Sequence, residues 1–273
     1  MTVDVLAEGL GIPESTRWRQ GRLWLCNWGT GEILALAPRG ERQVVARLDP
    51  STLPFSIDWL PDGRLLVVDG PRRELLVQEG ERLELLADLT GFGEAPFNEL
   101  VVDGAGNAYV NGGPGAVVVV RPDGGVRQVA EGLRWPNGMA LVDDGRTLVV
   151  ADSHARQLVG FEVREDASLS AGRVWAELDD APDGICADAD GAIWVASVPG
   201  RHCVRVREGG AILEAVEADR GCFACMLGGA DGATLFIAAA EWHGMEKLRD
   251  DGPGTTGQLL AAAGQAAAHA GRP

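Results

Sequence analysis

The sequence of 273 residues has little positive charge: Lys247 is its only lysine, and the formal net charge is -16. Such a surface repels phosphate backbones and anionic lipid, so nucleic acid and membrane headgroups are not expected partners. No apolar run approaches the length that crosses a bilayer, and the first residues, MTVDVLAEGLG, lack the basic and apolar regions of a secretory signal. A small-molecule substrate remains the expected partner, while the oligomeric state stays open.

Several common catalytic and metal-binding patterns are missing as well. The five cysteines, an odd number, do not suggest a disulfide framework, so we expect a reduced, cytoplasmic setting. The chain has no Gly-x-Ser-x-Gly elbow, and its four histidines lack the spacing of zinc ligands. Cys222-x-x-Cys225 has no second such pair and is interpreted as buried packing. The acidic run 179–191 fails the EF-hand pattern at its first and last ligand positions.

Six segments of the chain share one plan, in which a turn containing glycine leads into an apolar strand. The aligned glycines are Gly21, Gly63, Gly106, Gly145, Gly191 and Gly232. They recur about every 40 residues, a period typical of four-stranded propeller blades. The repeats predict an all-β fold, a six-bladed β-propeller with a central metal-binding channel. We expect residues 1–273 to form a single domain, with 264–273 as a frayed tail.

Other apolar runs supply the remaining strands of the blades. They are residues 32–37, 74–78, 116–120, 157–163 and 203–207. The ring must also be closed, and the segments 2–8 and 257–263 are expected to pair in one blade for that purpose. No convincing amphipathic helix interrupts the pattern.

One position in each repeat, seven or eight residues before the aligned glycine, begins an innermost strand and points to the channel. The six positions hold Glu14, Ser56, Asn98, Asn137, Asp183 and the pair Ala224 and Cys225. Four of the six carry carboxylate or amide oxygens of the type that binds a cation, and the two carboxylates would balance one divalent ion. Oxygen ligands favour Ca²⁺, Mg²⁺ or Mn²⁺, while Zn²⁺ and Fe²⁺ remain open.

Turn chemistry is the alternative explanation for these residues. Asn and Asp beside Pro and Gly commonly form turns. Turn formation therefore explains the residue type at any one of these positions taken alone. Their joint occurrence at one phase of the repeat favours a metal site. Pro13, Pro136 and Pro182 each precede one of these polar residues and stiffen the backbone that aims it.

Four stretches of the chain carry a resemblance to a known family. They are Gly-Ile-Pro-Glu14-Ser, Phe97-Asn98-Glu99, Pro136-Asn137-Gly138 with the strand end Val150-Ala151-Asp152-Ser153, and Pro182-Asp183-Gly184 followed by Gly191 and Trp194. With these, the sequence resembles the SMP-30/gluconolactonase/regucalcin-like family from about residue 7 to residue 262. The resemblance implies a six-bladed propeller with one divalent metal in its channel and lactone hydrolysis as the usual activity.

Carried over residue by residue, the resemblance makes Glu14, Asn137 and Asp183 the metal ligands and brings Asn98 to the substrate or the metal. Sugar-lactone members often have an arginine two residues before the asparagine that Asn98 resembles, and this chain has Pro96 there. A guanidinium is a bidentate anchor for polar oxygens. Its loss predicts weaker activity on aldonolactones than on less hydroxylated lactones or esters.

A mechanism follows from this site. A divalent ion would polarise a lactone carbonyl and stabilise the developing oxyanion. Asp183 is the predicted catalytic base, with Glu99 or Asp58 as alternatives. We predict that the substrate contacts Asn98, Glu99, Phe97 and Trp135.

Aromatic side chains are expected at the mouth of the channel. Phe55, Phe97, Trp135 and Trp242 would suit an apolar or cyclic substrate there, and packing between blades is the alternative role for them. Two classes of function remain: a metal-dependent hydrolase of a lactone, or of another ester or phosphoester, and a non-catalytic metal-binding propeller.

Overall fold

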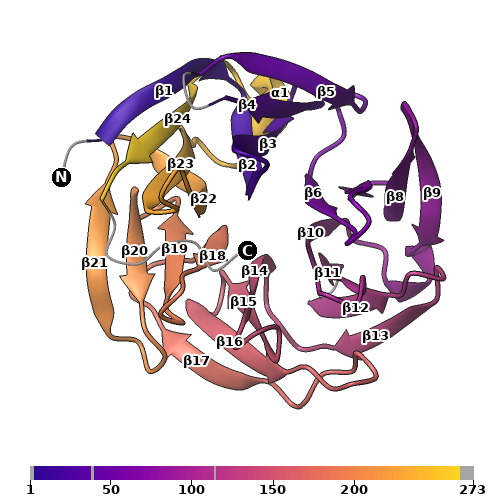
Figure 1. The fold of residues 1–273 in the computed structure, drawn as a ribbon. Helices are drawn as coiled ribbons and strands as arrows, with labels where there is room; N and C mark the ends of the chain where they lie inside the picture. Colours follow the sequence, from indigo (N-terminus) through magenta and orange to yellow (C-terminus); the bar gives the residue numbers. More distant parts are fainter. Residues whose placement is uncertain (1–2, 38–39, 114, 265–273) are drawn as a thin grey trace.

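The computed structural model describes residues 3–37, 40–113 and 115–264 of the chain. Six four-stranded antiparallel sheets stand around one axis as the blades of a propeller (Figure 1), which confirms the predicted six-bladed β-propeller. The expected frayed tail, residues 264–273, lies outside the described residues except for residue 264.

The first three blades follow each other along the chain, each running from its innermost to its outermost strand. Blade 1 contains β2 (Ile12–Arg19), β3 (Arg22–Trp28), β4 (Glu32–Leu36) and β5 (Arg42–Arg47). Blade 2 contains β6 (Phe55–Trp59), β7 (Leu65–Asp69), β8 (Glu74–Glu79) and β9 (Arg82–Asp88). Blade 3 contains β10 (Phe97–Val102), β11 (Ala108–Gly112), β12 (Ala116–Val120) and β13 (Val126–Ala130), and the 3-10 turn η1 (Thr90–Phe92) precedes it.

The other three blades complete the ring. Blade 4 contains β14 (Pro136–Val142), β15 (Thr147–Asp152), β16 (Gln157–Glu162) and β17 (Arg173–Glu177). Blade 5 contains β18 (Ile185–Ala187), β19 (Ile193–Ser197), β20 (His202–Val206) and β21 (Ile212–Glu217). Blade 6 contains β22 (Gly221–Gly228), β23 (Thr234–Ala240) and β24 (Gly257–Ala262), with β1 (Val3–Leu10) as its outermost strand.

The ring closes as the sequence predicted. β1 pairs antiparallel with β24, with Val3 opposite Ala262 and Leu10 opposite Gly257. The first strand of the chain therefore completes the last blade, and hydrogen bonds between strands join the two ends of the ring. In Figure 1, β1 and β24 lie side by side at the outer part of blade 6.

The six aligned glycines each sit in the turn between the first and second strand of a blade. Their φ angles are all positive, from 71° at Gly21 to 93° at Gly63. Residues with a side chain rarely adopt this backbone, so glycine recurs because the same tight turn is built six times.

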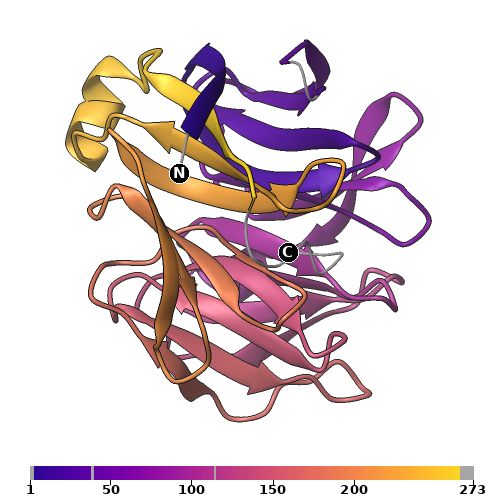
Figure 2. The same ribbon diagram turned by 60° about the vertical axis from the view of Figure 1, so that its left-hand side comes forward.

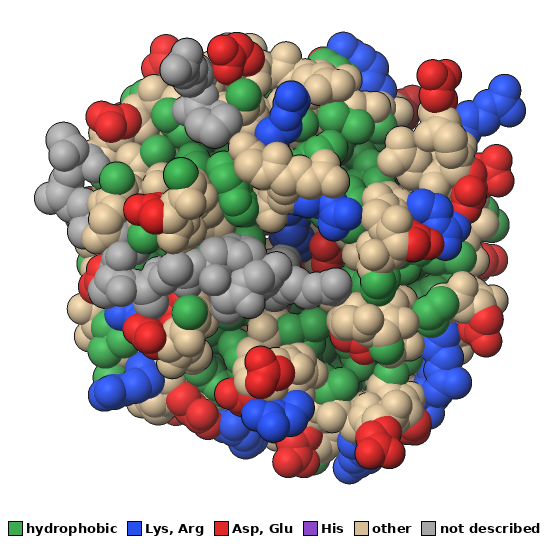
Figure 3. Space-filling view, in the orientation of Figure 1, with side chains coloured by type: hydrophobic (Ala, Val, Ile, Leu, Met, Phe, Trp, Pro, Cys, Tyr) green, Lys and Arg blue, Asp and Glu red, His purple; other side chains and the backbone are tan. Residues whose placement is uncertain are grey.

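The hydrophobic core lies between blades. One cluster joins blades 2 and 3 through residues such as Val68 and Val110, and another joins blades 3 and 4 through Val117 and Leu148. Inner strands such as β12 are buried along their whole length because neighbouring blades cover both faces of each sheet. Outermost strands such as β5 are largely exposed, and in Figure 3 acidic and basic side chains are interspersed around the periphery.

One element departs from the sequence-based expectation. A short helix, α1 (Met245–Asp251), follows β23, where we had predicted no helix. Figure 2 shows it projecting beyond the strands of blade 6. Seven residues are too few to display a helical period of apolar residues, which explains why the pattern was not detected. None of the described helices is long and apolar enough to cross a membrane.

Candidate metal centre and catalytic site

The candidate residues lie at one end of the ring, where the innermost strands begin; we call this end the mouth. At this end, the register of strand pairing shifts in three blades that carry candidate residues. The shifts fall between Glu14 and Arg17 in β2, between Phe97 and Leu100 in β10, and between Pro136 and Met139 in β14. A bulge breaks the regular alternation of side chains and re-aims them. Asn98 and Asn137 both lie within such a bulge.

Close approach of neighbouring innermost strands explains the glycines beside the candidate ligands. The amide of Gly138 donates to the carbonyl of Asp183 at 3.1 Å, and a Cβ at Gly138 would lie 2.6 Å from that oxygen. A Cβ at Gly184 would lie 2.7 Å from Cα of Ala224. A side chain at either position would push adjacent blades apart. The Pro-Asn-Gly and Pro-Asp-Gly motifs therefore join blades 4, 5 and 6 at the mouth.

Asp183 is held firmly through its backbone. Its amide donates to the carbonyl of Ala196 at 2.8 Å, and its own carbonyl accepts from Gly138. The residue is half-buried, while its Oδ1 atom is fully buried and has no hydrogen-bond partner among the described residues. Burial raises the pKa of this carboxyl to about 8, opposed by a hydrogen bond from Asn137 and reinforced by the charge of Glu99.

Glu14 is the second carboxylate of the site. It is buried, and one oxygen, Oε2, accepts the backbone amide of Ser15 at 3.0 Å. Burial, and then the charges of Asp183 and Glu99, raise the pKa of Glu14 well above its ordinary value. The two predicted carboxylate ligands are therefore close enough for each charge to oppose the other.

The two predicted amide residues are linked to each other. Asn98 Nδ2 donates to Asn137 Oδ1 at 3.2 Å, and Asn137 Nδ2 lies 3.5 Å from Ser153 Oγ. The Asn137 side chain is also near enough to the Asp183 carboxylate to lower the pKa of that group. Asn98, Asn137 and Asp183 thus form one chain of contacts across blades 3, 4 and 5. An amide oxygen has two acceptor sites, so Asn137 Oδ1 retains one beside its bond to Asn98.

The donor set fits a divalent cation. The Glu14 and Asp183 carboxylates repel each other, and Asp183 Oδ1 is buried without a partner in the described part of the chain. Buried charges are normally paired or bound to a metal. Among the described residues, no group of three or more histidine, cysteine, aspartate or glutamate side chains is placed to hold a metal ion. A metal here would therefore depend on an amide oxygen in addition to the two carboxylates.

Glu99, predicted to contact the substrate, lies in a buried network instead of an open position. Its Oε1 atom accepts from Arg17 at 3.0 Å, from Ser15 Oγ at 3.1 Å and from the amide of Leu100 at 2.9 Å. Ser15 has a φ of 49°, an uncommon backbone for a residue with a side chain. The network connects blade 1 to blade 3 directly beneath Glu14 and holds the bulge in place.

Asp58, an alternative base, links two other blades. Its Oδ1 accepts the amide of Trp59, and its Oδ2 accepts the amide of Val102 in β10, each at 2.8 Å. The carboxylate is buried and has further partners. Through these hydrogen bonds, the Asp58 side chain helps to hold blade 2 against blade 3.

The four aromatic residues predicted at the mouth divide into two groups. Phe55 and Phe97 are wholly buried in the core between blades, which is the packing alternative. Trp135 is 54% exposed and stacks on His154, with ring centroids 5.0 Å apart. Trp242 is 37% exposed and packs edge to face on Phe223 at 5.7 Å. The tryptophans are the two that offer surface to a ligand.

Sequence reasoning did not identify the side chains that support the site. Arg17 neutralises Glu99, Asn111 Oδ1 accepts the amide of Glu99 at 3.3 Å, and Ser153 Oγ donates to the carbonyl of Pro182 at 2.6 Å. Asn111 and Ser153 lie where the second strand of a blade ends. The frequent small or polar residue at that point of the repeat was the available signal.

The Cys222-x-x-Cys225 pair has the packing role that the sequence suggested. Both thiols are free and buried, and they lie with Cys186 and Cys203 in the core that joins blades 5 and 6. Cys225 Sγ is 3.7 Å from the carbonyl of Gly184, so this core lies directly behind Asp183.

A dependence of stability on pH follows from the carboxylate pair. The pKa of Asp183 is raised from 3.8 to about 8 by burial, and that of Glu14 is raised by burial as well. The folded protein retains protons that the unfolded chain releases, so metal-free protein should lose stability as pH rises from about 4 to about 8. Urea unfolding at pH 5 and pH 9 in the presence of a chelator measures this loss. Asp183→Asn should show a smaller loss, and an identical loss in the variant would contradict the assignment.

Comparison with known proteins gives consistent matches. The profile of the SMP-30/Gluconolactonase/LRE-like region matches residues 12–241. A luciferin-regenerating enzyme superposes with a TM-score of 0.83 at 17% identity, over 98% of this chain and 97% of the other. Regucalcin from Agrobacterium tumefaciens, described as a calcium-binding protein, gives 0.79 at 19% identity over 98% and 95%. A gluconolactonase from Xanthomonas campestris gives 0.74 at 20% identity over 96% and 89%.

Proposed function

The chain belongs to the SMP-30/gluconolactonase/LRE-like family, and from this premise we propose that it is a divalent-metal-dependent hydrolase of lactones. One observation carries the proposal: the mouth brings together two repelling carboxylates, Glu14 and Asp183, with Asp183 Oδ1 buried and unpaired among the described residues. Such a pair is costly unless a cation neutralises it.

Glu14, Asn137 and Asp183 would hold the metal. Their oxygen atoms favour a hard cation such as Ca²⁺, Mg²⁺ or Mn²⁺ over Zn²⁺ or Fe²⁺. When bound, a divalent cation polarises the lactone carbonyl and stabilises negative charge on its oxygen.

The side chains of the protein supply orientation and proton transfer. The Asn98 amide carries two N–H donors, and the one that Asn137 does not accept can hold a substrate oxygen. The exposed ring of Trp135, two residues before Asn137 in the sequence, offers apolar surface. The backbone hydrogen bonds of Asp183 fix the position from which its side chain projects.

In the proposed reaction Asp183 moves one proton. Water attacks the carbonyl carbon of the lactone and transfers a proton to the Asp183 carboxylate as the new C–O bond forms. The protonated Asp183 then donates that proton to the ring oxygen as the ring C–O bond breaks. This donation returns Asp183 to its charged form, and the product is the open hydroxy acid, whose new acid group then loses its own proton to solvent.

Loss of the Glu14 carboxylate tests the metal centre. Glu14→Gln removes half of the negative charge of the pair, so metal content should fall from about one divalent ion per chain to a small fraction. Elemental analysis of protein purified without chelator measures it. Glu84→Gln, on the exposed strand β9, is the matched control and should keep full occupancy. Equal occupancy in both variants would remove Glu14 from the site.

The response to metal separates a hydrolase from a non-catalytic propeller. Adding a divalent cation to chelated protein should raise the rate of lactone hydrolysis as well as the melting temperature. A rise in melting temperature alone, across a panel of lactones and cations, would favour a structural metal and overturn the proposed activity.

A further inference from the structure

The six blades differ in one loop at the mouth, the loop between the second and third strand. In blades 1 to 5 this loop comprises residues 29–31, 70–73, 113–115, 153–156 and 198–201. In blade 6 it comprises residues 241–256 and contains α1. Because strands within a blade alternate in direction, this loop lies at the end where the innermost strand begins. A single long loop at the mouth of a repeat fold is typical of a functional insertion.

The 241–256 segment is anchored at both ends. The amide of Glu241 donates to Thr256 Oγ1 at 3.1 Å, which ties its first residue to its last. Arg220 donates to the carbonyl of Thr256 at 2.6 Å. Pro253 lies where a side chain at Gly29 would be, since a Cβ there would stand 1.8 Å from Pro253 Cγ. The segment therefore bridges blade 6 to blade 1.

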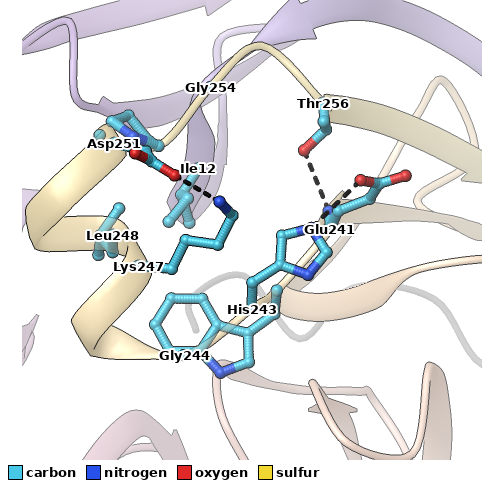
Figure 4. Close-up of a pocket in the computed structure, with 12 residues that line it drawn as sticks. Ile12, Glu241, His243, Gly244, Lys247, Leu248, Asp251, Gly254 and Thr256 are labelled. Atoms are coloured by element: carbon cyan, nitrogen blue, oxygen red, sulfur yellow. Dashed lines mark hydrogen bonds and ion pairs between the residues drawn. The ribbon is translucent and has the colours of Figure 1, made fainter.

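The segment forms a half-open pocket of about 220 Å³ against β2 (Figure 4). Its apolar walls come from Ile12, Trp242, Leu248 and Pro253. In Figure 4, Lys247 and Leu248 project from the helix on the side facing Ile12, while His243 and Glu241 stand opposite the helix. An apolar cavity of about 150 Å³ accommodates benzene. This pocket thus has room for an aromatic ring or a chain of about six carbons.

The pocket shares structural elements with the candidate catalytic site. Ile12 and Glu14 lie on the same side of β2, two residues or about 7 Å apart. Trp242 packs on Phe223, whose carbonyl accepts the amide of Gly184 at 2.8 Å, and Gly184 follows Asp183 directly. The pocket therefore lies beside the elements that carry Glu14 and Asp183.

The charged side chains around the pocket lie in pairs at its rim. Lys247 forms an ion pair with Asp251, and His243 Nε2 lies 3.5 Å from Glu241. All four side chains are more than half exposed, and exposed pairs contribute little to stability. Both pairs face water, whereas the walls are apolar, so the interior of the pocket favours an apolar group.

We propose that the 241–256 pocket binds an apolar substituent of the substrate, so that the preferred substrates are lactones carrying an alkyl or aryl group. The inference rests on the proposed lactonase function. Trp242 and Leu248 act as specificity-determining residues, and they place the substituent while the lactone ring lies at Asp183.

Two γ-lactones, one unsubstituted and one carrying a hexyl chain, test the inference by activity. In Trp242→Ala we expect kcat/KM for the hexyl lactone to fall about tenfold through a higher KM, since about two methylene groups lose an apolar wall. The unsubstituted lactone should be unaffected. Trp242→Phe keeps an apolar ring and should retain most of the preference. Leu85→Ala, on the exposed strand β9, is the control for removal of surface apolar area.

Binding of non-hydrolysable lactams separates this inference from the proposed activity. Calorimetry should show the hexyl lactam binding at least tenfold more tightly than the unsubstituted lactam, with the difference lost in Trp242→Ala. Equal affinities in the wild-type protein, or an undiminished difference in a Trp242→Ala protein of unchanged melting temperature, would overturn the pocket assignment. Absence of lactone hydrolysis with intact lactam selectivity would instead refute the proposed function alone.

Discussion

Replacing Asp183 by asparagine is expected to lower kcat by about 10² to 10⁴, even at saturating metal. Asparagine keeps the size of the side chain and one oxygen donor, so a residue acting only as ligand would regain activity when the metal concentration is raised. Asparagine cannot accept the proton that the attacking water releases. Steady-state rates over a metal titration give kcat at saturation.

Asp180 offers a matched control three residues earlier in the same loop. Its side chain is 42% exposed and lies 3.6 Å from His202 at the surface, so Asp180→Asn should keep normal kcat. Near-normal kcat in metal-saturated Asp183→Asn would refute the role of Asp183 as base. Proton transfer would then need another acceptor, and Glu99 or Asp58 would have to leave its buried hydrogen bonds to serve as one.

Replacing Arg17 by leucine is expected to lower the free energy of unfolding by about 3 to 5 kcal/mol. Arg17 is 5% exposed and makes three hydrogen bonds, to Glu99 Oε1, to the carbonyl of Leu100 and to the carbonyl of Thr16. Its removal leaves the Glu99 charge buried and uncompensated, close to Glu14 and Asp183. Urea unfolding of metal-free protein measures the change.

Two further variants distinguish this cause from a general loss of packing. In Arg17→Leu combined with Glu99→Gln the uncompensated charge is absent, so part of the stability should return. Arg64→Leu removes a guanidinium from an exposed pair with Asp62 and should change the free energy of unfolding far less. A similar loss in the two single variants would show that the buried position of Arg17 is unimportant.

The fold could be predicted because its main determinant is local and repeated. A positive φ at Gly21 and its five counterparts requires glycine, and each such turn is followed by a strand whose apolar residues pack against a neighbouring blade. Turn chemistry and strand composition are properties of a few adjacent residues, so a single sequence displays them six times. The pairing of β1 with β24 could be predicted as well, because the last blade of the ring lacked a fourth strand and the start of the chain could supply it.

The site was only partly predictable. Repeat phase placed Glu14, Asn137 and Asp183 on innermost strands, and the structure brings them to one end of the ring. The bulges at Asn98 and Asn137 arise from the pairing of two strands. The residue types in either strand alone do not predict where these bulges form. The seven residues of α1 were too short to show a period.

The sequence by itself determined the six-fold repeat, the order of the strands and the candidate ligands, because each depends on residues within one repeat. Only the tertiary structure decided which charges meet. Arg17 and Glu99 are 82 residues apart in the chain and 3.0 Å apart in space, and Phe97 turned inward to the core while Trp135 stayed exposed. These outcomes depend on how neighbouring blades pack, and packing is a property of pairs of distant segments that composition and spacing within one segment do not encode.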